Sequence, residues 1–259
     1  MSETEFLETA IDAARTAGSV LLEWQDRFTV SEKNRSDLVT EADLESQEVI
    51  ASLIGQQYPE HGLLGEEGLE KSDGGSGYRW IIDPLDGTGN YVHGIPYFAV
   101  SIALECDGDL AVGVVLDPTR DEFFTAVRGQ GAHLNGQRLS VSADRISSLE
   151  QALVMASLPV GVESSDDPAI ARFLRVLTVA QHTQRTGSAA MNLAYLAAGR
   201  LDAFFSTSLK PWDMAAGALL VREAGGRVTD LSQAPFDISV PSLLASNGSD
   251  VHRQLAALL

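Results

Sequence analysis

Two aspartates bracket a proline turn in the stretch Asp83-Pro84-Leu85-Asp86-Gly87-Thr88. Carboxylates at this spacing can bind a divalent metal, because Mg2+ prefers hard oxygen ligands. Gly87 allows a helix to start close to a ligand, and Thr88 adds a hydroxyl and backbone N–H groups that favour an anion. A single stretch of this kind is also typical of an acidic surface turn. The rest of the chain must therefore decide between a metal and phosphate site and a simple turn.

Two further acids have similar surroundings. Glu66 follows a short apolar segment and stands in a Gly-Glu-Glu-Gly turn, and Asp213 falls in the first turn of a predicted helix that begins with proline. Four carboxylates favour Mg2+ over zinc, and the histidines have no zinc-ligand spacing. Cys106, the only cysteine, has no catalytic partner motif, and we expect it to lie in the core.

The elements that must position these acids begin with two helices. Apolar residues at helical spacing predict a helix at 6–24. Thr40 and Asp43, a variant of the capping box, predict the start of a second helix, which runs to about Tyr58, where Pro59 stops it. The polar residues 26–36 between them predict a loop or a strand pair, which we expect to be mobile.

An apolar run at 78–82 predicts a buried strand that Pro84 ends, so that Asp83 and Asp86 lie at its carboxyl end. A short strand at 61–64 precedes it. Turn signals between apolar runs then predict consecutive antiparallel strands at 97–104, 110–116 and 122–127 and a hairpin at 129–139 that turns at Asn135-Gly136.

Strands and helices alternate in the rest of the chain. We expect strands at 152–157, 183–186, 201–206 and 243–245, and helices at 168–179, 188–198, 211–224 and 249–258. The chain therefore divides into residues 1–143, with helices, an antiparallel sheet and most of the acids, and residues 144–259, an α/β half with Asp213.

Acidic residues dominate the charge, with 36 Asp and Glu against 18 Lys and Arg and a formal net charge of -18. Such a surface repels nucleic acid and anionic membranes, so we expect neither as a partner. It also repels a phosphorylated substrate unless cations are bound in the site. The acids outside the motifs are typical of a solvated or salt-adapted surface.

Length and composition indicate an ordinary globular protein. The 259 residues are 44% hydrophobic, enough for one large domain or two closely packed ones. No stretch approaches the roughly 20 apolar residues of a spanning helix. A single cysteine and an acidic start without a secretory signal predict a cytoplasmic protein.

These motifs together resemble those of the inositol monophosphatase family. The matching stretches, in the family's order, are DLVTEAD at 37–43, GEE at 65–67, WIIDPLDGTGN at 80–90, GSAA at 187–190 and WDMAAG at 212–217. The resemblance implies an α+β fold, a five-layer αβαβα sandwich. It also implies a Mg2+ requirement with two or three ions per subunit, sensitivity to Li+ and a homodimer.

The resemblance also implies roles for individual residues. The ligands of a first Mg2+ are Glu66, Asp83, the Leu85 carbonyl and Asp86, those of a second are Asp83, Asp86 and Asp213, and Glu66 shares a third ion through water. Asp43 and Thr88 orient or deprotonate the attacking water. The backbone amides of Gly87 and Thr88 bind phosphate.

Other matched positions concern the substrate and a loop. The resemblance implies that Gly187, Ser188 and Ala189 line the polyol side of the substrate, together with Asp213, and that Lys33 belongs to a mobile, metal-sensitive loop. Where animal members have a Glu that contacts inositol hydroxyls, this chain has Ser206. A hydroxyl lacks the charge-assisted hydrogen bond of a carboxylate, which weakens a strict preference for inositol.

We therefore expect a Mg2+-dependent phosphomonoesterase that hydrolyses myo-inositol 1-phosphate, a small phosphorylated polyol, with metal-activated water. The alternatives within this chemistry are fructose 1,6-bisphosphate, histidinol phosphate and a 3′-phosphonucleotide. An alternative of another class is a non-catalytic regulatory module that binds a phospholigand. The complete acidic set with Asp43 and Thr88 argues against that module.

Overall fold

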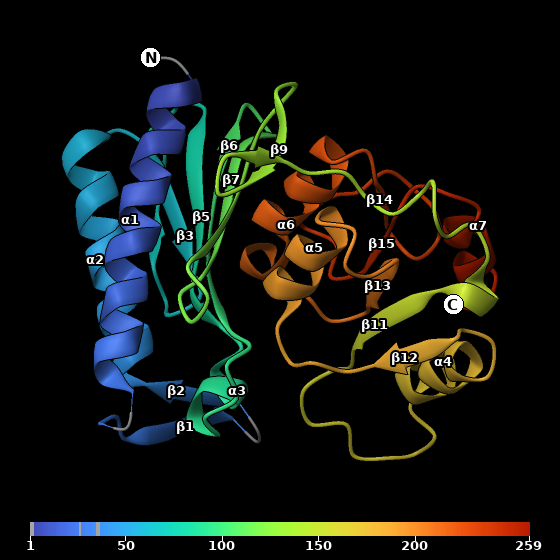
Figure 1. Ribbon diagram of the computed structural model, residues 1–259. Coiled ribbons are helices and arrows are strands. Elements are labelled where there is room, and N and C mark those ends of the chain that lie inside the picture. The colour runs from blue at the N-terminus through green and yellow to red at the C-terminus, as the bar shows by residue number, and fades with distance from the viewer. Residues whose placement is uncertain (1–2, 26, 35–36) are drawn as a thin grey trace.

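The chain folds into five layers of helices and sheets, α+β in class, as expected (Figure 1). The computed structural model describes residues 3–25, 27–34 and 37–259. Two helices cover the outer face of an eight-stranded sheet, two more lie between this sheet and a five-stranded sheet, and another two cover the far side. In this order the helices are α1 (Glu3–Trp24) and α2 (Glu41–Gln57), α5 (Ala189–Ala197) and α6 (Pro211–Glu223), and α4 (Pro168–Leu177) and α7 (Val251–Ala256).

The larger sheet carries the proline turn near one end of a central strand. Its strand order is β10-β9-β8-β7-β6-β5-β3-β4, and all neighbours are antiparallel except β3 and β5. The strands are β3 (Gly62–Gly65), β4 (Glu70–Lys71), β5 (Tyr78–Asp86), β6 (Ala99–Cys106), β7 (Asp109–Asp117), β8 (Glu122–Val127), β9 (Gly131–Leu134) and β10 (Gln137–Arg138). The predicted antiparallel strands and hairpin are confirmed, while β4 was not predicted.

The smaller sheet has the order β12-β11-β13-β15-β14 and mixes parallel and antiparallel pairs. Its strands are β11 (Leu153–Ser157), β12 (His182–Gln184), β13 (Ala203–Ser206), β14 (Arg227–Thr229) and β15 (Leu243–Ser246). The 3-10 turn η1 (Leu149–Gln151) precedes it. Neither β14 nor η1 was predicted, because both are only three residues long and have no extended apolar pattern.

A strand pair and a short helix lie at one end of the large sheet (Figure 1). The antiparallel strands β1 (Val30–Asn34) and β2 (Asp37–Thr40) confirm the strand-pair alternative for the polar segment after α1, and residues 26, 35 and 36 of that segment lie outside the described residues. The helix α3 (Thr88–Val92) follows the proline turn directly. This end of the sheet is therefore where the predicted site residues of the first half gather.

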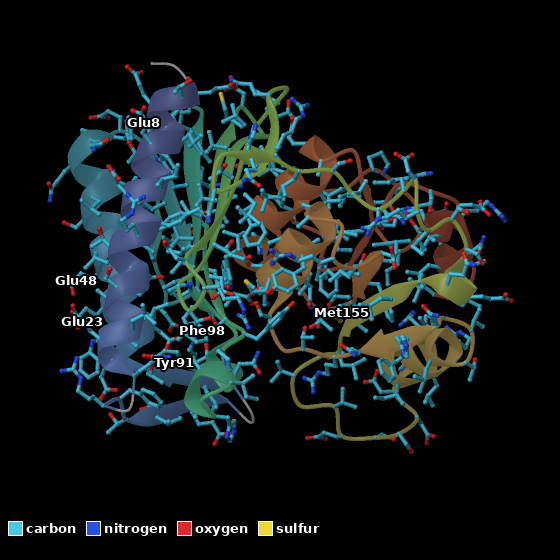
Figure 2. All side chains as sticks on the ribbon, in the orientation of Figure 1. Glu8, Glu23, Glu48, Tyr91, Phe98 and Met155 are labelled. Carbon is cyan, nitrogen blue, oxygen red and sulfur yellow. The ribbon has the colours of Figure 1, made fainter. Side chains whose placement is uncertain are left out.

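Three apolar cores fill the spaces between the five layers, and the central one reaches both sheets through α5 and α6 (Figure 2). On β5, Trp80 and Ile82 belong to the core under α1 and α2, whereas Ile81 belongs to the core that contains α5 and α6. Both faces of this strand are buried, which explains its continuous apolar run. Close approach of α6 depends on Gly113 of β7, because a Cβ there would lie 2.9 Å from the Ala216 carbonyl oxygen.

The strand β5 does not end at Pro84, contrary to the sequence prediction. It continues to Asp86, with Asp83 paired to Ser101 and Asp86 paired to Ala99 across a bulge. Proline has no N–H to donate, and a bulge is a place where a strand can accommodate it. The hydroxyl of Ser46 donates to the Pro84 carbonyl oxygen at 2.8 Å, so α2 also holds the bulge.

The expectation that Cys106 lies in the core is wrong. Cys106 is the last residue of the interior strand β6 and is only partly buried, where the chain turns toward Asp107. Burial of a cysteine depends on where its strand ends in the sheet, which residue type alone does not specify. The division of the chain at residue 143, in the segment between β10 and η1, stays a prediction. Among the described residues, no helix has both the length and the apolar composition needed to cross a membrane.

Candidate active site

Three of the predicted metal ligands converge. Asp83 and Asp86 flank the bulge of β5, and Asp213 comes from the first turn of α6 in the other half of the chain. Each offers a carboxylate oxygen, and these oxygens lie within 4.8 Å of one another. Asp83 and Asp86 are 1% and 8% exposed, respectively. The fold thus brings together acids that are about 130 positions apart in the chain.

Burial and mutual repulsion disfavour the charged forms of these acids. Burial raises the pKa of Asp86 to about 6 and, together with the charge of Asp86, raises the pKa of Asp213 to about 8. Burial and the neighbouring charges of Glu66, Asp86 and Asp213 raise the pKa of Asp83 well above its usual range. A cation would relieve this repulsion, and a donor set of carboxylate oxygens suits a hard ion such as Mg2+. The residues present therefore fit a divalent metal.

Glu66 lies beside the cluster, in the turn after β3. It stands outside the set of oxygens that meet within 4.8 Å, and its charge nevertheless raises the pKa of Asp83. Burial, opposed by the nearby ammonium group of Lys33, raises the pKa of Glu66 itself to about 7. Lys33 Nζ is 3.3 Å from Glu66 Oε1 and 2.6 Å from Glu67 Oε1. Lys33 on β1 is thus a cation that already faces two acids at the edge of the site.

The backbone of the bulge is fixed by hydrogen bonds within it. The Leu85 amide donates to Asp83 Oδ1 at 3.1 Å, and the Leu85 carbonyl oxygen accepts from Thr88 Oγ1 at 3.1 Å. A carbonyl oxygen has two lone pairs, so the bond from Thr88 leaves Leu85 one acceptor position. The predicted role of this carbonyl as a ligand is compatible with that geometry.

Asp43 and Thr88 lie within hydrogen-bonding distance, with 3.1 Å between Thr88 Oγ1 and Asp43 Oδ1. The other Asp43 oxygen accepts from the Thr40 amide at 2.8 Å, as the predicted capping box of α2 requires, and also from the Thr40 hydroxyl at 2.6 Å. Asp43 has no exposed surface. Burial, partly opposed by the Thr40 bonds, raises its pKa to about 6. The single proton of the Thr88 hydroxyl thus has two acceptors at the same distance, Asp43 and the Leu85 carbonyl oxygen.

The backbone at Gly87 has a conformation and a close packing that favour glycine over residues with a side chain. Its φ is 101°, in the left-handed region, and a Cβ on it would lie 3.1 Å from the Tyr97 carbonyl oxygen and 3.3 Å from Ser188 Cβ. Both conditions favour glycine. The chain can therefore turn directly from Asp86 into α3, which keeps Thr88 next to the acids.

The second half of the chain contributes hydrogen-bond donors to Asp86. Ser188 Oγ donates to Asp86 Oδ2, as does the Ala190 amide at 2.7 Å, and the Ala189 amide lies 3.3 Å from Asp86 Oδ1. Next to them, Gly187 packs on Asn90, which donates to the Tyr97 and Thr186 carbonyl oxygens at 2.7 and 2.8 Å. Sequence reasoning missed this link between the N-terminus of α5 and the proline turn.

Ser206 lies at the end of β13, paired with Ser157 and Leu243, and has no exposed surface. Its hydroxyl accepts from the Ser208 amide at 3.4 Å. Contact of Ser206 or of the segment 187–189 with a substrate stays a prediction.

Two residues that sequence reasoning missed also contact the site from α2. Ser46 and Gln47 are buried and polar, and they lie three and four positions after Asp43, on the same face of the helix. This spacing was a signal that the sequence offered.

The fold and the acidic site are those of a metal-dependent phosphatase family. The model of the inositol monophosphatase family matches residues 2–259, and the chain belongs to this family.

Individual relatives match nearly the whole chain. This chain is 45% identical to the Nus factor SuhB of Pseudomonas aeruginosa over 248 residues, which are 93% of this chain and 91% of that protein. The crystal structure of the extragenic suppressor protein suhB from Bartonella henselae is 37% identical, with a TM-score of 0.92 and 98% of each chain covered. The inositol monophosphatase from Anabaena is 35% identical, with a TM-score of 0.88 and 98% of this chain and 95% of that chain covered.

Proposed function

We propose that this chain is a Mg2+-dependent phosphomonoesterase that hydrolyses myo-inositol 1-phosphate. The observation that carries the proposal is the convergence of Asp83, Asp86 and Asp213 beside the hydrogen-bonded pair Asp43 and Thr88. Membership of the inositol monophosphatase family supports the reaction class, and the name of the Anabaena structure supports the choice of inositol phosphate.

Mg2+ would be held by carboxylates from both halves of the chain. In this proposal Glu66, Asp83, the Leu85 carbonyl and Asp86 bind one ion, Asp83, Asp86 and Asp213 bind a second, and Glu66 shares a third through water. When bound, the metal would lower the pKa of water and offset the charge of a phosphate ester. It would also overcome the repulsion between a phosphate and a chain of net charge -18.

The residues of the chain would orient and deprotonate the nucleophile. Asp43 accepts the proton of the Thr88 hydroxyl, which frees the Thr88 oxygen to accept a proton from the attacking water. The Leu85 carbonyl oxygen competes with Asp43 for the same Thr88 proton. In this proposal the negative charge of Asp43 directs the hydroxyl proton toward the carboxylate. The amides of Gly87 and Thr88 would bind phosphate oxygens.

The test is phosphate release with Mg2+ from myo-inositol 1-phosphate, fructose 1,6-bisphosphate, histidinol phosphate and a 3′-phosphonucleotide. We expect the highest kcat/KM for myo-inositol 1-phosphate. The Asp86→Asn variant should fold, as judged by circular dichroism, and lose measurable release. Near-normal phosphate release by this variant would contradict the assignment of Asp86 to the site. A higher kcat/KM for another compound would show that this compound, and not myo-inositol 1-phosphate, is the preferred substrate.

A second candidate function is that of a Nus factor, which the name of the Pseudomonas relative favours. The net charge of -18 favours a protein partner over RNA for such a role. Fluorescence anisotropy with labelled single-stranded RNA at 50 mM salt tests this preference, and saturable binding there would contradict it. Sedimentation equilibrium of the protein alone tests the homodimer that the family resemblance implies.

A further inference from the structure

Three buried polar side chains follow one face of α2. Asp43, Ser46 and Gln47 are 0%, 0% and 9% exposed and have the spacing i, i+3 and i+4. Each contacts a different segment of the site. Asp43 accepts from Thr88, Ser46 donates to the Pro84 carbonyl oxygen, and Gln47 contacts the turn after β3. A buried polar stripe at these positions costs stability unless every group is paired, and here all three are.

Gln47 binds both backbone polar groups of one residue, Glu67. Its Oε1 accepts from the Glu67 amide at 3.0 Å, and its Nε2 donates to the Glu67 carbonyl oxygen at 3.2 Å. The side chain therefore pairs with the Glu67 backbone as a neighbouring strand would. Glu67 itself carries the carboxylate that contacts Lys33 at 2.6 Å.

The other amides of this turn are paired with backbone carbonyl oxygens. The Gly65 amide donates to the Leu69 carbonyl oxygen at 2.8 Å, the Glu66 amide to Ile82 at 3.3 Å, and the Gly68 amide to Glu66 at 2.9 Å. The Glu67 amide is the one N–H among residues 65–68 that depends on a side chain. Removal of the Gln47 amide would therefore leave the Glu67 N–H, directly after Glu66, without its hydrogen-bond partner.

Gly65 makes room for Gln47. A Cβ on Gly65 would lie 2.5 Å from Gln47 Oε1 and 3.3 Å from Gln47 Cδ. The close approach is possible only because residue 65 has no side chain. The glycine in the turn and the glutamine on α2 thus fit together in shape at this contact.

We propose that Gln47 is a positioning residue that holds the turn 65–68. In this position Glu66 faces the metal site and Glu67 forms the ion pair with Lys33. The inference rests on the proposed function only in assigning Glu66 to the metal. Gln47 touches no substrate or metal in this role and acts through the Glu67 backbone.

The experiment compares Mg2+ binding by the wild-type protein, Gln47→Met and Gln57→Met by titration calorimetry. Methionine has a similar volume to glutamine and lacks the amide. Gln57 is the matched control, because it lies on the same helix and accepts a hydrogen bond from Thr9 at 2.6 Å, away from the site. We expect Gln47→Met to bind Mg2+ roughly 10-fold more weakly, the loss typical of a partner that orients a ligand, and Gln57→Met to bind within about twofold of wild type.

Two further readouts separate positioning from general destabilisation. In Gln47→Met, hydrogen exchange should become faster in the peptide that covers 65–68 and stay unchanged in the α6 peptide that contains Asp213. If the protein releases phosphate, the Mg2+ concentration for half-maximal rate should rise while kcat at saturating Mg2+ stays within about threefold. If Gln47→Met does not fold, Gln47→Asn replaces it, since its amide is one methylene too short to reach Glu67.

Equal Mg2+ affinity in the wild type and in the folded Gln47 variant would overturn the inference. A wild-type protein that binds Mg2+ but releases no phosphate from any compound would overturn the proposed function and leave the positioning role in place. The two failures are therefore distinguishable.

Discussion

The three clustered aspartates differ in the donors that surround them. Asp86 accepts from Ser188 and from two amides at the start of α5, whereas Asp83 accepts from the Leu85 amide and Asp213 from the Lys210 amide at 2.7 Å. Hydrogen bonds to a carboxylate favour its charged form. This agrees with a pKa of about 6 for Asp86 against about 8 for Asp213. Asp86 is thus the member of the cluster best prepared to stay ionised without a cation.

His252 is a buried residue outside the site whose protonation state is set by its neighbours. Its Nε2 lies 3.1 Å from Thr229 Oγ1, which donates to the Asp230 carbonyl oxygen, so Nε2 must carry the proton. Its Nδ1 lies 2.8 Å from Ser246 Oγ and accepts from it. Burial, with a smaller contribution from the charge of Arg227, lowers the pKa of His252 to about 4. The neutral imidazole is therefore part of the packing between α7 and the small sheet.

The low pKa of His252 predicts a loss of stability in mild acid. The unfolded chain takes up this proton near pH 6.5 and the folded chain only near pH 4, so the stabilisation is complete above pH 6.5 and is lost as the pH falls toward 4. At pH 5 the loss is about 2 kcal/mol. Urea unfolding at pH 7 and pH 5 should show a drop smaller by this amount in His252→Gln than in wild type. His182→Gln, on the exposed surface of β12, should behave as wild type, and an equal drop in all three proteins would contradict the assignment.

At the scale of elements, the first turns of three helices meet the site. Asp43 occupies the third position of α2, Asp213 the third position of α6, and Asp86 accepts from the first amides of α5. The N-terminal end of a helix has a partial positive charge, which stabilises a nearby carboxylate by roughly 0.3–1 kcal/mol. The helices thus offset part of the cost of gathering acids in a buried place.

The turn into α3 offers a direct test with two glycines. Gly87→Ala should lower the free energy of unfolding by roughly 2–4 kcal/mol, because its φ of 101° is strained for alanine and the new Cβ would lie 3.1 Å from the Tyr97 carbonyl oxygen. Gly89→Ala is the control two residues later, where a Cβ meets nothing within 4 Å. In the helix it should be neutral or stabilise by up to about 1 kcal/mol. Thermal unfolding measures both, and similar Tm values for the two variants would refute this account of the turn.

At the scale of the whole molecule, the acids form two populations. Many project into solvent, as Glu8, Glu23 and Glu48 do from α1 and α2 (Figure 2), whereas Asp43, Asp83 and Asp86 are buried at the site. Salt of any kind screens the first population, because exposed charges interact through water. Only an ion bound between the buried carboxylates relieves the second.

This difference predicts two separable effects of salt on Tm. NaCl should raise the Tm of the wild-type protein, and MgCl2 at the same ionic strength should raise it further by binding to the folded state. Asp213→Asn should keep the response to NaCl, lose the additional response to MgCl2, and unfold no earlier than wild type without metal, because burial and Asp86 already disfavour the charged form of Asp213. Identical shifts by the two salts in wild type would count against a specific metal site.

Local patterns in the sequence were sufficient for much of the fold. Helical spacing predicted α1, the Thr40 and Asp43 pair predicted the start of α2, and Asn135-Gly136 predicted the hairpin turn, where both residues have positive φ. Such features depend on residues within a few positions of one another. The motif set likewise identified the family and named the three aspartates that converge, although their role as ligands stays a prediction.

The tertiary structure alone decided what depends on register and on contacts between distant residues. The strand β5 continues past Pro84 because β6 pairs with Asp86 beyond the bulge, and Cys106 is partly exposed because it is the last residue of β6. The bonds from Ser188 to Asp86 and from Gln47 to Glu67 join residues 102 and 20 positions apart. The sequence determined which groups can bind a metal, since that is a property of residue types and short spacings, and the fold determined which distant donors hold each group in place.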